Sequence, residues 1–454
     1  MYNITLPSGL VGFHNTNTES VTTVSGLGAY LLHGNIDRDE KDSLCPHCGK
    51  TMHIHNTYEV NLRHLCIGGN LSCLRFPKDR FLCPSCRHTK MQEVPFQAEG
   101  HRITTALFTY ARDLLAYGFT NKAVTYLTKL GKNTVKDIDM QRLREKYTID
   151  GKTLIRPERQ TKYLGIDEFK LHNGHKYAVV IIDMETGHIL WLAHGKKKAT
   201  VYSFIEHVGL EWMDGVEAIA CDMNSDFEEA FEHMCPHIQI VYDYFHIVKN
   251  FHEKVVAEVR KDEQKRLLSE GDTKAAESLK KSRYILTSSR QTLMRKDKEA
   301  EEGRAISKGS SLFCKEAVTR KSGYVERYEA LLSQNRLLFT LDLIKEKLSE
   351  AYKATDEIKM ADMVSEIMDI CASTGNKHLR WFKRLLDNHF EGIIAHATYT
   401  ISAGKIEGIN GKIKTIRRQG YGYADDDYFF LKLFDASRKE YVRNPKSNKI
   451  PQGL

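Results

Sequence analysis

The sequence predicts a multidomain α/β protein: a mixed sheet with a large helical insertion, preceded by a cysteine-rich module and a small helical module. Three observations lead to this prediction. Six of the ten cysteines fall between Cys45 and Cys86. Strand-like and helical runs follow one another over residues 160–246, an order typical of mixed α/β sheets. Residues 247–395 then lose strand character and resemble long, charged helices.

The composition is that of a globular protein with more than one domain, since 41% of the 454 residues are hydrophobic and 28% are charged. No stretch approaches the roughly 18 apolar residues of a membrane span. The first 30 residues lack a basic start followed by an apolar core, so no secretory signal is expected. We therefore expect a cytoplasmic protein in a reducing compartment, without a membrane partner.

The cysteine-rich module contains two CxxC pairs, Cys45-Pro-His-Cys48 and Cys83-Pro-Ser-Cys86, with 34 residues between them. Each CxxC turn presents two thiolates, and two such turns complete a tetrahedral zinc site. Gly49 fits the tight knuckle after the first pair. Because the gap exceeds the roughly 15–20 residues of the compact pattern, a longer β-rich insert is expected. Cys66 and Cys73 lie in this insert and stay unassigned.

Three short helices are expected between residues 101 and 147. Apolar residues recur at three and four positions from Ile103 to Leu115, and Gly118 followed by Thr120 supplies a stop and a new N-cap. A basic last helix is typical of a helix-turn-helix, although a small helical connector is the alternative. Its expected DNA-binding residues are Lys132, Lys136, Arg142 and Arg144.

The β-rich runs and turn residues of residues 160–246 predict three strands, a helix, a strand, a helix and a strand, in this order. The expected strands are 162–169, 176–184, 188–194, 216–221 and 238–242, and the expected helices are 199–210 and 225–234. The charged segment after this sheet has little apolar periodicity up to about residue 320. We expect it to form an extended helical insertion, because it is too charged for a second compact core.

Three carboxylates are candidates for chemistry. Asp167 lies near the end of the first strand, and Asp222 directly follows the fourth. If these strands are neighbours, the two side chains meet at one edge of the sheet, and Glu407 at the start of a late helix would complete the pocket. Three carboxylates around two magnesium or manganese ions roughly 3.5–4 Å apart are suited to phosphodiester chemistry.

The helix expected around Glu407 is basic, as is the region of the three short helices. Residues 101–160 hold 12 Lys/Arg and 6 Asp/Glu, and residues 401–454 hold 11 and 6. Such segments suit a nucleic-acid partner, although a solvated cationic face is the alternative. The side chains expected to hold a DNA backbone near Glu407 are Lys405, Lys412, Lys414, Arg417 and Arg418. Asn410 lies three residues beyond Glu407, on a neighbouring face.

Three segments, GIDEFKLHNGHKYAVVIIDMETG, VYDYFHIVKNF and KIEGINGKIKTIRRQGYGY, resemble the ISL-three group of bacterial insertion-sequence DDE transposases. With the CxxC pairs and the helix-turn-helix, the resemblance covers residues 41–437. It implies an RNase H-like catalytic fold with Asp167 as first acid and Glu407 as last acid. It also implies that the helices after Asp243 form an insertion domain.

The middle acid is either Asp222 or Asp243. Asp222 lies where the RNase H-like order of elements has its second acid, and we favour it as the metal ligand. Asp243 begins Asp243-Tyr-Phe-His246, which is similar to the D-x-x-H signature of related transposases. His246 would then orient a phosphate or the scissile strand, although a core histidine is the alternative.

The sequence thus predicts seven segments. They are an N-terminal segment (1–40), a zinc ribbon (41–95), a helix-turn-helix (100–150), the first part of the RNase H-like domain (160–246), the helical insertion (247–395), the last part of the RNase H-like domain with the Glu407 helix (396–440) and a C-terminal tail (441–454).

The expected function is that of a DNA transposase associated with the nucleoid. It would bind terminal inverted repeats, cut a phosphodiester with two metal ions and transfer the freed strand to target DNA. Because two ends must be joined, a homodimer or higher assembly on double-stranded DNA is expected. The alternatives are a non-catalytic zinc-ribbon regulator and a metal-dependent nuclease that cuts without joining.

Overall fold

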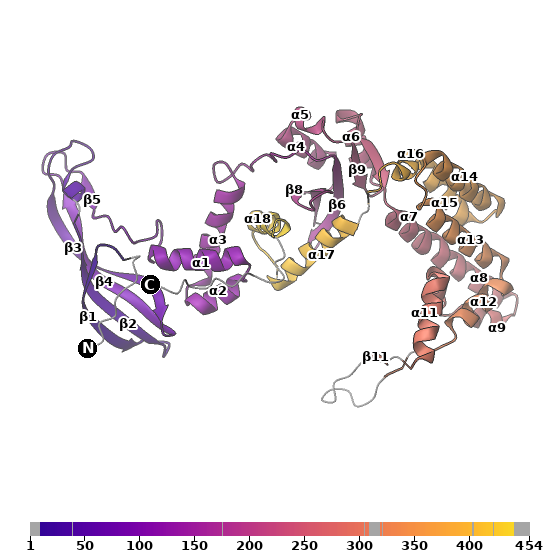
Figure 1. Ribbon diagram of the computed structural model, residues 1–454, viewed down its shortest axis with the longest axis horizontal. Coiled ribbons are helices and arrows are strands. Elements are labelled where there is room, and N and C mark those ends of the chain that lie inside the picture. Colours follow the sequence, from indigo (N-terminus) through magenta and orange to yellow (C-terminus); the bar gives the residue numbers. More distant parts are fainter. Residues whose placement is uncertain are drawn as a thin grey trace, which may run out of the picture. The chain divides into compact units, whose positions relative to one another are not determined.

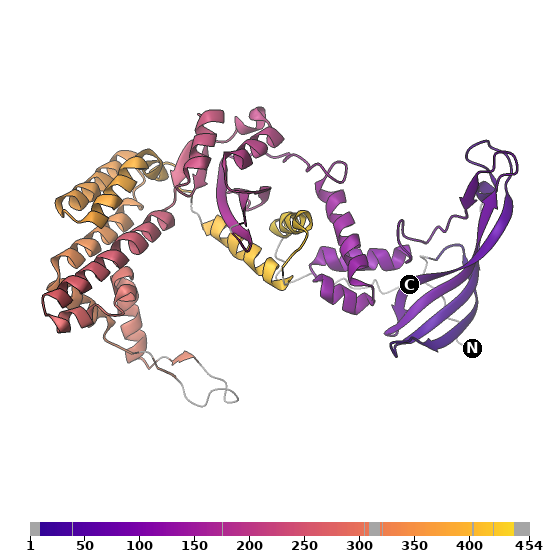
Figure 2. The same ribbon diagram turned by 180° about the vertical axis from the view of Figure 1, so that it is seen from behind.

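The computed structural model describes residues 10–38, 40–174, 176–303, 305–307, 318–319, 321–401, 404–420 and 422–439 (Figure 1; seen from behind in Figure 2). The tail expected at 441–454 lies outside these residues. The chain divides into two compact units, residues 1–155 with 416–432 and residues 156–415 with 433–454. Among the described residues, no helix is long and apolar enough to cross a membrane.

The first unit begins with a five-stranded sheet in the order β1-β2-β4-β3, with β5 also paired to β4. Its strands are β1 (Phe13–Thr22), β2 (Gly28–Ile36), β3 (His53–Ile67), β4 (Asn70–Leu82) and β5 (Thr89–Met91). The β3–β4 hairpin is the β-rich insert expected between the CxxC pairs. Edge-to-face contacts among Phe13, Phe76 and Phe96, with ring centroids 5.8–6.1 Å apart, form the centre of its core.

Three helices follow the sheet in the first unit. They are α1 (Thr105–Tyr117), α2 (Asn121–Thr128) and α3 (Lys132–Tyr147). Gly118 ends α1 in a left-handed conformation at φ 113°, and the Thr120 side chain caps α2 by accepting the N–H of Ala123. Both features were expected from the sequence. The unit also includes the end of α17 (Gly404–Gln419) and the start of α18 (Asp426–Ser437).

The second unit contains a five-stranded sheet in the order β10-β9-β6-β7-β8. Its strands are β6 (Tyr163–His172), β7 (Lys176–Asp183), β8 (Ile189–His194), β9 (Ala218–Cys221) and β10 (Gln239–Tyr242). Strands β6, β7 and β8 are antiparallel, whereas β9 and β10 run parallel to β6. The helices α4 (Lys198–Val208), α5 (Leu210–Met213) and α6 (Ser225–Met234) connect them. This mixed sheet confirms the predicted fold class and order of elements.

The insertion is a set of helices between β10 and α17. They are α7 (Tyr244–Asn250), a π-helical segment (Phe251–Val256), α8 (Ala257–Ser269), α9 (Thr273–Ser278), α10 (Arg283–Thr287), α11 (Arg290–Glu301), α12 (Tyr324–Gln334), α13 (Arg336–Ala351), α14 (Glu357–Ser373), α15 (Lys377–Asn388) and α16 (Phe390–Ile394). Two short strands, β11 (Ala305–Ser307) and β12 (Val318–Thr319), pair between α11 and α12.

This segment was expected to be too charged for a second compact core, and its buried residues instead extend the core of the sheet. Leu293, Ile344, Met360 and Phe382 are fully buried and belong to the same apolar cluster as the sheet. The charged side chains lie on the outer faces of the helices. An apolar residue at every third or fourth position is enough to give each helix one face that packs into the core.

Candidate active site and metal centre

The candidate active site lies at the edge of the second sheet where β6 and β9 run in parallel (Figure 1). Gly165 of β6 pairs with Ala220 of β9. Asp167 follows Gly165 by two residues, and Asp222 is the first residue after β9. Asp167 lies in the middle of β6 and not near its end as expected, because β6 continues to His172. Both aspartates are two residues beyond the paired Gly165 and Ala220, so the parallel register brings their carboxylates together.

Asp167 is held by two hydrogen bonds. Its Oδ1 accepts the main-chain N–H of Glu168 at 2.7 Å, and its Oδ2 accepts the Nδ2 group of Asn410 at 2.5 Å. Burial raises the pKa of the Asp167 carboxyl, and the negative charge of Asp222 adds to this effect. His246 and the Asn410 amide act in the opposite direction without cancelling it. A cation at this edge would lower that pKa and favour the charged form of Asp167.

Asp222 and His246 form a second pair at the same edge. The Asp222 Oδ1 atom lies 3.7 Å from the His246 Nδ1 atom and accepts the N–H of Met223 at 2.8 Å. The Asp222 side chain is 49% exposed, whereas that of His246 is 14% exposed. Among the described residues, the buried His246 Nδ1 atom has no hydrogen-bond partner. Asp222 is thus open to a ligand, with a mostly buried imidazole behind it.

Asp243 has different surroundings. It is only 7% exposed, and its Oδ2 caps α7 by accepting the N–H of Phe245 at 2.8 Å. Burial raises the pKa of Tyr352, and the charge of Asp243 raises it further. The same charge opposes the burial that lowers the pKa of His396. Asp243 therefore interacts with side chains that follow α13 and α16, while positioning the helix that carries His246.

Glu407 lies in the first turn of α17 and is exposed. It is three residues before Asn410, and side chains at this spacing have Cβ atoms about 5–6 Å apart. The contact between Asn410 and Asp167 thus brings the Glu407 turn near the sheet edge. Among the described residues, only the cysteines discussed next form a group of three or more potential metal ligands within 4.8 Å. Asn410 was not among the predicted site residues, although its spacing from Glu407 pointed to it.

The second candidate metal centre is the cysteine cluster of the first unit. The ligand atoms of Cys45, Cys48, Cys83 and Cys86 all lie within 4.8 Å of one another. Two Sγ pairs, Cys45 with Cys86 and Cys48 with Cys83, are 3.5 Å apart. A tetrahedral ion with Zn–S bonds of about 2.3 Å has its sulfurs about 3.8 Å apart, so the cluster fits zinc.

The two knuckles of this cluster repeat one backbone geometry. The N–H of Gly49 bonds to the carbonyl of Cys45, and the N–H of Arg87 bonds to that of Cys83. Gly49 and Arg87 have φ values of 70° and 63°, so both adopt the left-handed conformation that glycine favours. Main-chain N–H groups, first that of Cys86, lower the pKa of Cys83 to about 6, whereas burial and the other three thiols raise the pKa of Cys86 to about 12. The cluster thus holds a thiolate at Cys83, and a bound cation would favour that form in the other cysteines.

Comparison with known proteins identifies the family. The profile of the ISL3-type DDE transposases, described as a transposase, matches residues 164–433, which is more than half of the chain. The chain belongs to the ISL3 family of transposases. A second profile, the zinc-finger of the IS204/IS1001/IS1096/IS1165 transposases, matches residues 42–86 and so includes all four cysteines of the cluster.

Two relatives extend this result. This transposase is 28% identical over 395 residues to the transposase for insertion sequence element IS1001 from Bordetella parapertussis, covering 87% of this chain and 88% of the relative. It is also 29% identical over 85 residues to the transposase for insertion sequence element IS1557 from two strains of Mycobacterium tuberculosis, 19% of each chain.

The predicted DNA-binding residues of α17 fall into two groups in the transposase. Lys405 donates to the carbonyls of Met184 and Glu185 at 2.6 and 2.7 Å, and Lys412 donates to that of Ala436 at 2.5 Å. These two lysines attach the first part of α17 to the rest of the second unit. Lys414 and Arg418 are exposed, and Arg417 is half-buried. The outer side of the helix is therefore open to a phosphate backbone.

On α3 the predicted residues divide in the same way. Lys132 and Arg144 are exposed. Lys136 pairs with Asp425 at 2.7 Å. Arg142 is only 5% exposed and donates to Asp139 from Nε and from a terminal nitrogen at 3.0 and 2.8 Å. Arg142 thus has little surface to offer to DNA, because it neutralises a buried carboxylate.

Asp139 is the centre of a buried polar network in the first unit. The residue has no exposed surface, and its Oδ2 accepts the Tyr428 hydroxyl at 2.6 Å and the Lys432 ammonium at 2.8 Å. Burial opposes the charge of Asp139, but Lys432, Tyr428 and Arg142 together lower its pKa. The network fixes the segment after α17 against α3.

Proposed function

We propose that this transposase cuts and joins DNA strands at a divalent-metal site formed by Asp167, Asp222 and Glu407. The observation that supports it is the convergence of Asp167, Asp222 and His246 at one sheet edge, with Asn410 of α17 bonded to Asp167. Asp243, which caps α7, is proposed to act through the position of His246.

The donor set suits magnesium or manganese. Carboxylate and amide oxygens are the ligands these ions prefer. The Oδ1 atom of Asn410 is buried and has no hydrogen-bond partner in the part of the chain that the structure describes, and Asp167 lies in desolvated surroundings. A pair of such ions would activate the attacking oxygen and stabilise the leaving oxygen.

The side chains contribute position and charge. Asp167 and Asp222 would bind the metal ions. Glu407 lies one helical turn before Asn410, so the contact between Asn410 and Asp167 positions Glu407 as the third carboxylate ligand. His246 orients the scissile phosphate beside Asp222. Water attacks a phosphodiester at the transposon end, the bond to the leaving oxygen breaks, and a 3′-hydroxyl is released. That hydroxyl then attacks a phosphodiester of target DNA and displaces its 3′-oxygen.

Recognition of the terminal inverted repeats is proposed for the zinc ribbon and the helix-turn-helix. The exposed cations Lys132 and Arg144 of α3, and Lys414 and Arg418 of α17, supply phosphate contacts. Lys136, Arg142, Lys405 and Lys412 hold the protein together instead. Because two ends must be joined, the active form is proposed to be a homodimer or a higher assembly.

The test is cleavage and joining of a labelled transposon-end duplex with magnesium or manganese, with DNA binding recorded in parallel. The Asp167→Asn, Asp222→Asn and Glu407→Gln variants are expected to bind the duplex but to neither cut nor join it. Glu211→Gln, an exposed carboxylate of the same unit, is the matched control and should act as wild type. Wild type that binds without cutting would indicate a regulator, and cutting without joining would indicate a nuclease.

A further inference from the structure

Helix α15 of the insertion has one apolar face and one cationic face. Leu379, Phe382 and Leu386 are fully buried in the core cluster of the second unit. Arg380 and Arg384 are exposed. Because they are four residues apart, these two arginines lie one above the other on the same side of the helix, about 6 Å apart along its axis.

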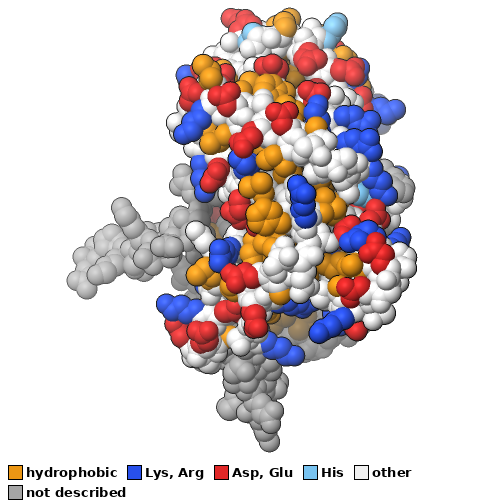
Figure 3. Space-filling model, turned by 90° about the vertical axis from the view of Figure 1, so that its right-hand side faces the viewer, with side chains coloured by type: hydrophobic (Ala, Val, Ile, Leu, Met, Phe, Trp, Pro, Cys, Tyr) orange, Lys and Arg blue, Asp and Glu red, His pale blue; other side chains and the backbone are white. Residues whose placement is uncertain are grey.

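The charge of α15 differs from that of its neighbour. It contains four Lys/Arg residues and a single carboxylate, Asp387, near its end. Helix α14, which packs against it, contains four carboxylates and one lysine. On the face of the molecule drawn in Figure 3, basic and acidic side chains are intermixed. Helix α15 therefore carries a local excess of positive charge beside an acidic neighbour.

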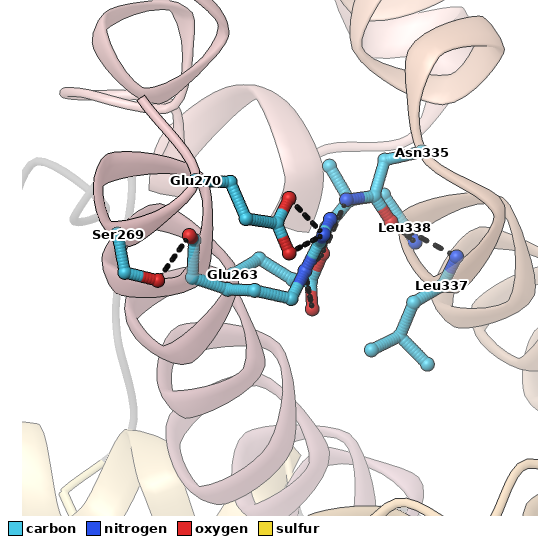
Figure 4. Close-up of polar contacts among 7 residues, drawn as sticks. Glu263, Ser269, Glu270, Asn335, Leu337 and Leu338 are labelled. Atoms are coloured by element: carbon cyan, nitrogen blue, oxygen red, sulfur yellow. Dashed lines mark hydrogen bonds and ion pairs between the residues drawn. The ribbon is translucent and has the colours of Figure 1, made fainter. Parts of the chain in front are cut away.

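The other arginines of the insertion show how cations there are usually satisfied. Arg266 lies between two carboxylates of its own helix, with distances of 3.0 Å to Glu263 and 2.6 Å to Glu270. Figure 4 shows Glu263, Glu270 and Asn335 meeting at this point. The arginines that bind a carboxylate or a main-chain carbonyl are Arg260, Arg266, Arg283, Arg290, Arg295 and Arg327.

Arg380 and Arg384 are different. Among the described residues, neither has a hydrogen bond or an ion pair from its side chain, and Lys383 between them has no ion pair. The nearest acid at the start of the helix, Asp262, is taken by Lys377 at 2.9 Å and by His378 at 3.1 Å. The guanidinium groups thus keep all their donors available for an anion from outside the chain.

We propose that Arg380, Lys383 and Arg384 form a second DNA-binding surface, which holds the backbone of duplex DNA next to the cleavage site. The proposal rests on the proposed function, because it names a further contact of the same substrate. Planar guanidinium groups bind phosphate through paired hydrogen bonds, and such contacts give affinity without reading sequence.

The fold connects this surface to the active-site sheet. Helix α15 leads directly into α16, which packs against β10, the strand that ends just before Asp243. Gly392 of α16 lies so close to Tyr242 of β10 that a Cβ atom there would clash with the tyrosine ring. The helix pair is therefore fixed to the sheet, so DNA bound along α15 would keep a defined position relative to Asp222.

The experiment measures binding of a fluorescent transposon-end duplex with flanking DNA over a series of salt concentrations, with cleavage recorded on the same samples. The test variant is Arg380→Gln with Arg384→Gln. The matched control is Arg336→Gln with Lys359→Gln, which removes two exposed cations from other helices of the insertion. Neither of them has a side-chain ion pair to another described residue. Circular dichroism melting shows whether each variant folds as wild type does.

For the test variant, the slope of log affinity against log salt concentration is expected to fall by about 1.8, because each phosphate contact contributes about 0.9. Affinity at about 0.1 M salt should fall by a factor on the order of ten or more. The control should keep the wild-type slope. An Arg380→Glu and Arg384→Glu variant should bind more weakly still.

The outcomes separate this proposal from the proposed function. If wild type binds and cuts the duplex while the test variant keeps the wild-type slope, the α15 surface does not bind DNA. A surface for an acidic protein partner would also give that result. If wild type itself neither binds nor cuts, both proposals fail. If the slope of log affinity against log salt concentration falls in the test variant but not in the control, the α15 surface is supported, even where cleavage is weak.

Discussion

The Nδ2 atom of Asn410 lies 2.5 Å from the Oδ2 atom of Asp167 and joins α17 to the sheet edge of the candidate active site. An Asn410→Ala variant should lose this contact together with the orientation of the Glu407 turn. Removing a residue that orients a metal ligand typically costs about 10–100-fold in metal affinity or activity. We expect a loss of this size in single-turnover cleavage, measured over a magnesium titration.

The pH dependence of the cleavage rate is a second test of the Asn410→Ala variant. Burial raises the pKa of Asp167 and the Asn410 amide lowers it, so removing the amide should raise it further. Because the carboxylate is the metal-binding form, the acidic limb of the pH–rate profile should move to higher pH. Gln419→Ala, an exposed residue at the end of α17, is the control. A slower variant with an unshifted profile would mean that Asn410 acts only on folding.

Asp222 and Asp243 can be separated by pairs of substitutions. Asn caps helices about as well as Asp does, whereas Ala costs about 1 kcal/mol. If Asp243 is a cap and Asp222 a ligand, Asp243→Asn should keep measurable cleavage, and Asp243→Ala should melt at a lower temperature. Asp222→Asn should bind DNA but not cut it. Cleavage that survives in Asp222→Asn and disappears in Asp243→Asn would reverse the assignment.

The meeting of Asp167 and Asp222 could be predicted from the sequence because Asp167 lies within an apolar strand and Asp222 directly follows another. This prediction requires only the apolar patterns of the two strands and the assumption that the strands are neighbours in the sheet. The bond between Asp167 and Asn410 joins residues 243 positions apart, and no periodicity in either segment encodes it. This hydrogen bond depends on how α17 packs on the sheet, and no local sequence pattern predicts that tertiary contact.

The same distinction explains two features that local sequence patterns do not predict. β1 is mostly polar and exposed, so nothing in its sequence distinguishes it from a loop, although β2 pairs along its whole length. Arg142 was expected on a DNA-binding face because α3 is basic. Its position three residues after Asp139 puts it on the buried face instead, and only the tertiary contact with α18 reveals that a carboxylate there needs neutralising.

The cysteine cluster should bind one zinc ion per chain. Cys83→Ser is expected to lose that ion and the fold of the knuckles, because binding energy at a structural zinc site is folding energy. All three tryptophans, Trp191, Trp212 and Trp381, lie in the second unit. Tryptophan fluorescence melting should therefore stay unchanged while circular dichroism melting and end binding weaken. Zinc is measured by metal analysis of the purified chain.

Cys73→Ser is the control for the zinc prediction. Cys73 is a half-buried free thiol on β4, in the sheet of the first unit, and it lies outside the four-cysteine group. Its substitution should leave the zinc content at one ion per chain. Acidification should release zinc from wild type, because protons compete for the thiolates. A full complement of zinc in Cys83→Ser would contradict the four-sulfur site.

The network around Asp139 should dominate the stability of the helical part of the first unit. Asp139→Asn leaves Arg142 and Lys432 without their carboxylate in surroundings with little water. Breaking a buried ion pair in this way typically costs about 3–5 kcal/mol. The loss should appear as faster amide hydrogen exchange in α2 and α3, with no change in tryptophan fluorescence melting. Asp137→Asn, an exposed carboxylate on the same helix, should have almost no effect.

The pH dependence of stability tests whether Asp139 is charged. Its neighbours lower its pKa in the folded protein, so its contribution is fully present above the ordinary aspartate pKa of about 3.9. That contribution should be lost as the pH falls below this value toward the lowered pKa of the folded state. Wild type should thus lose protection in α3 on acidification more steeply than Asp139→Asn, which has no such carboxylate to protonate. Equal slopes would mean that Asp139 is already neutral in the folded protein and that Lys432 binds it only as a hydrogen-bond donor.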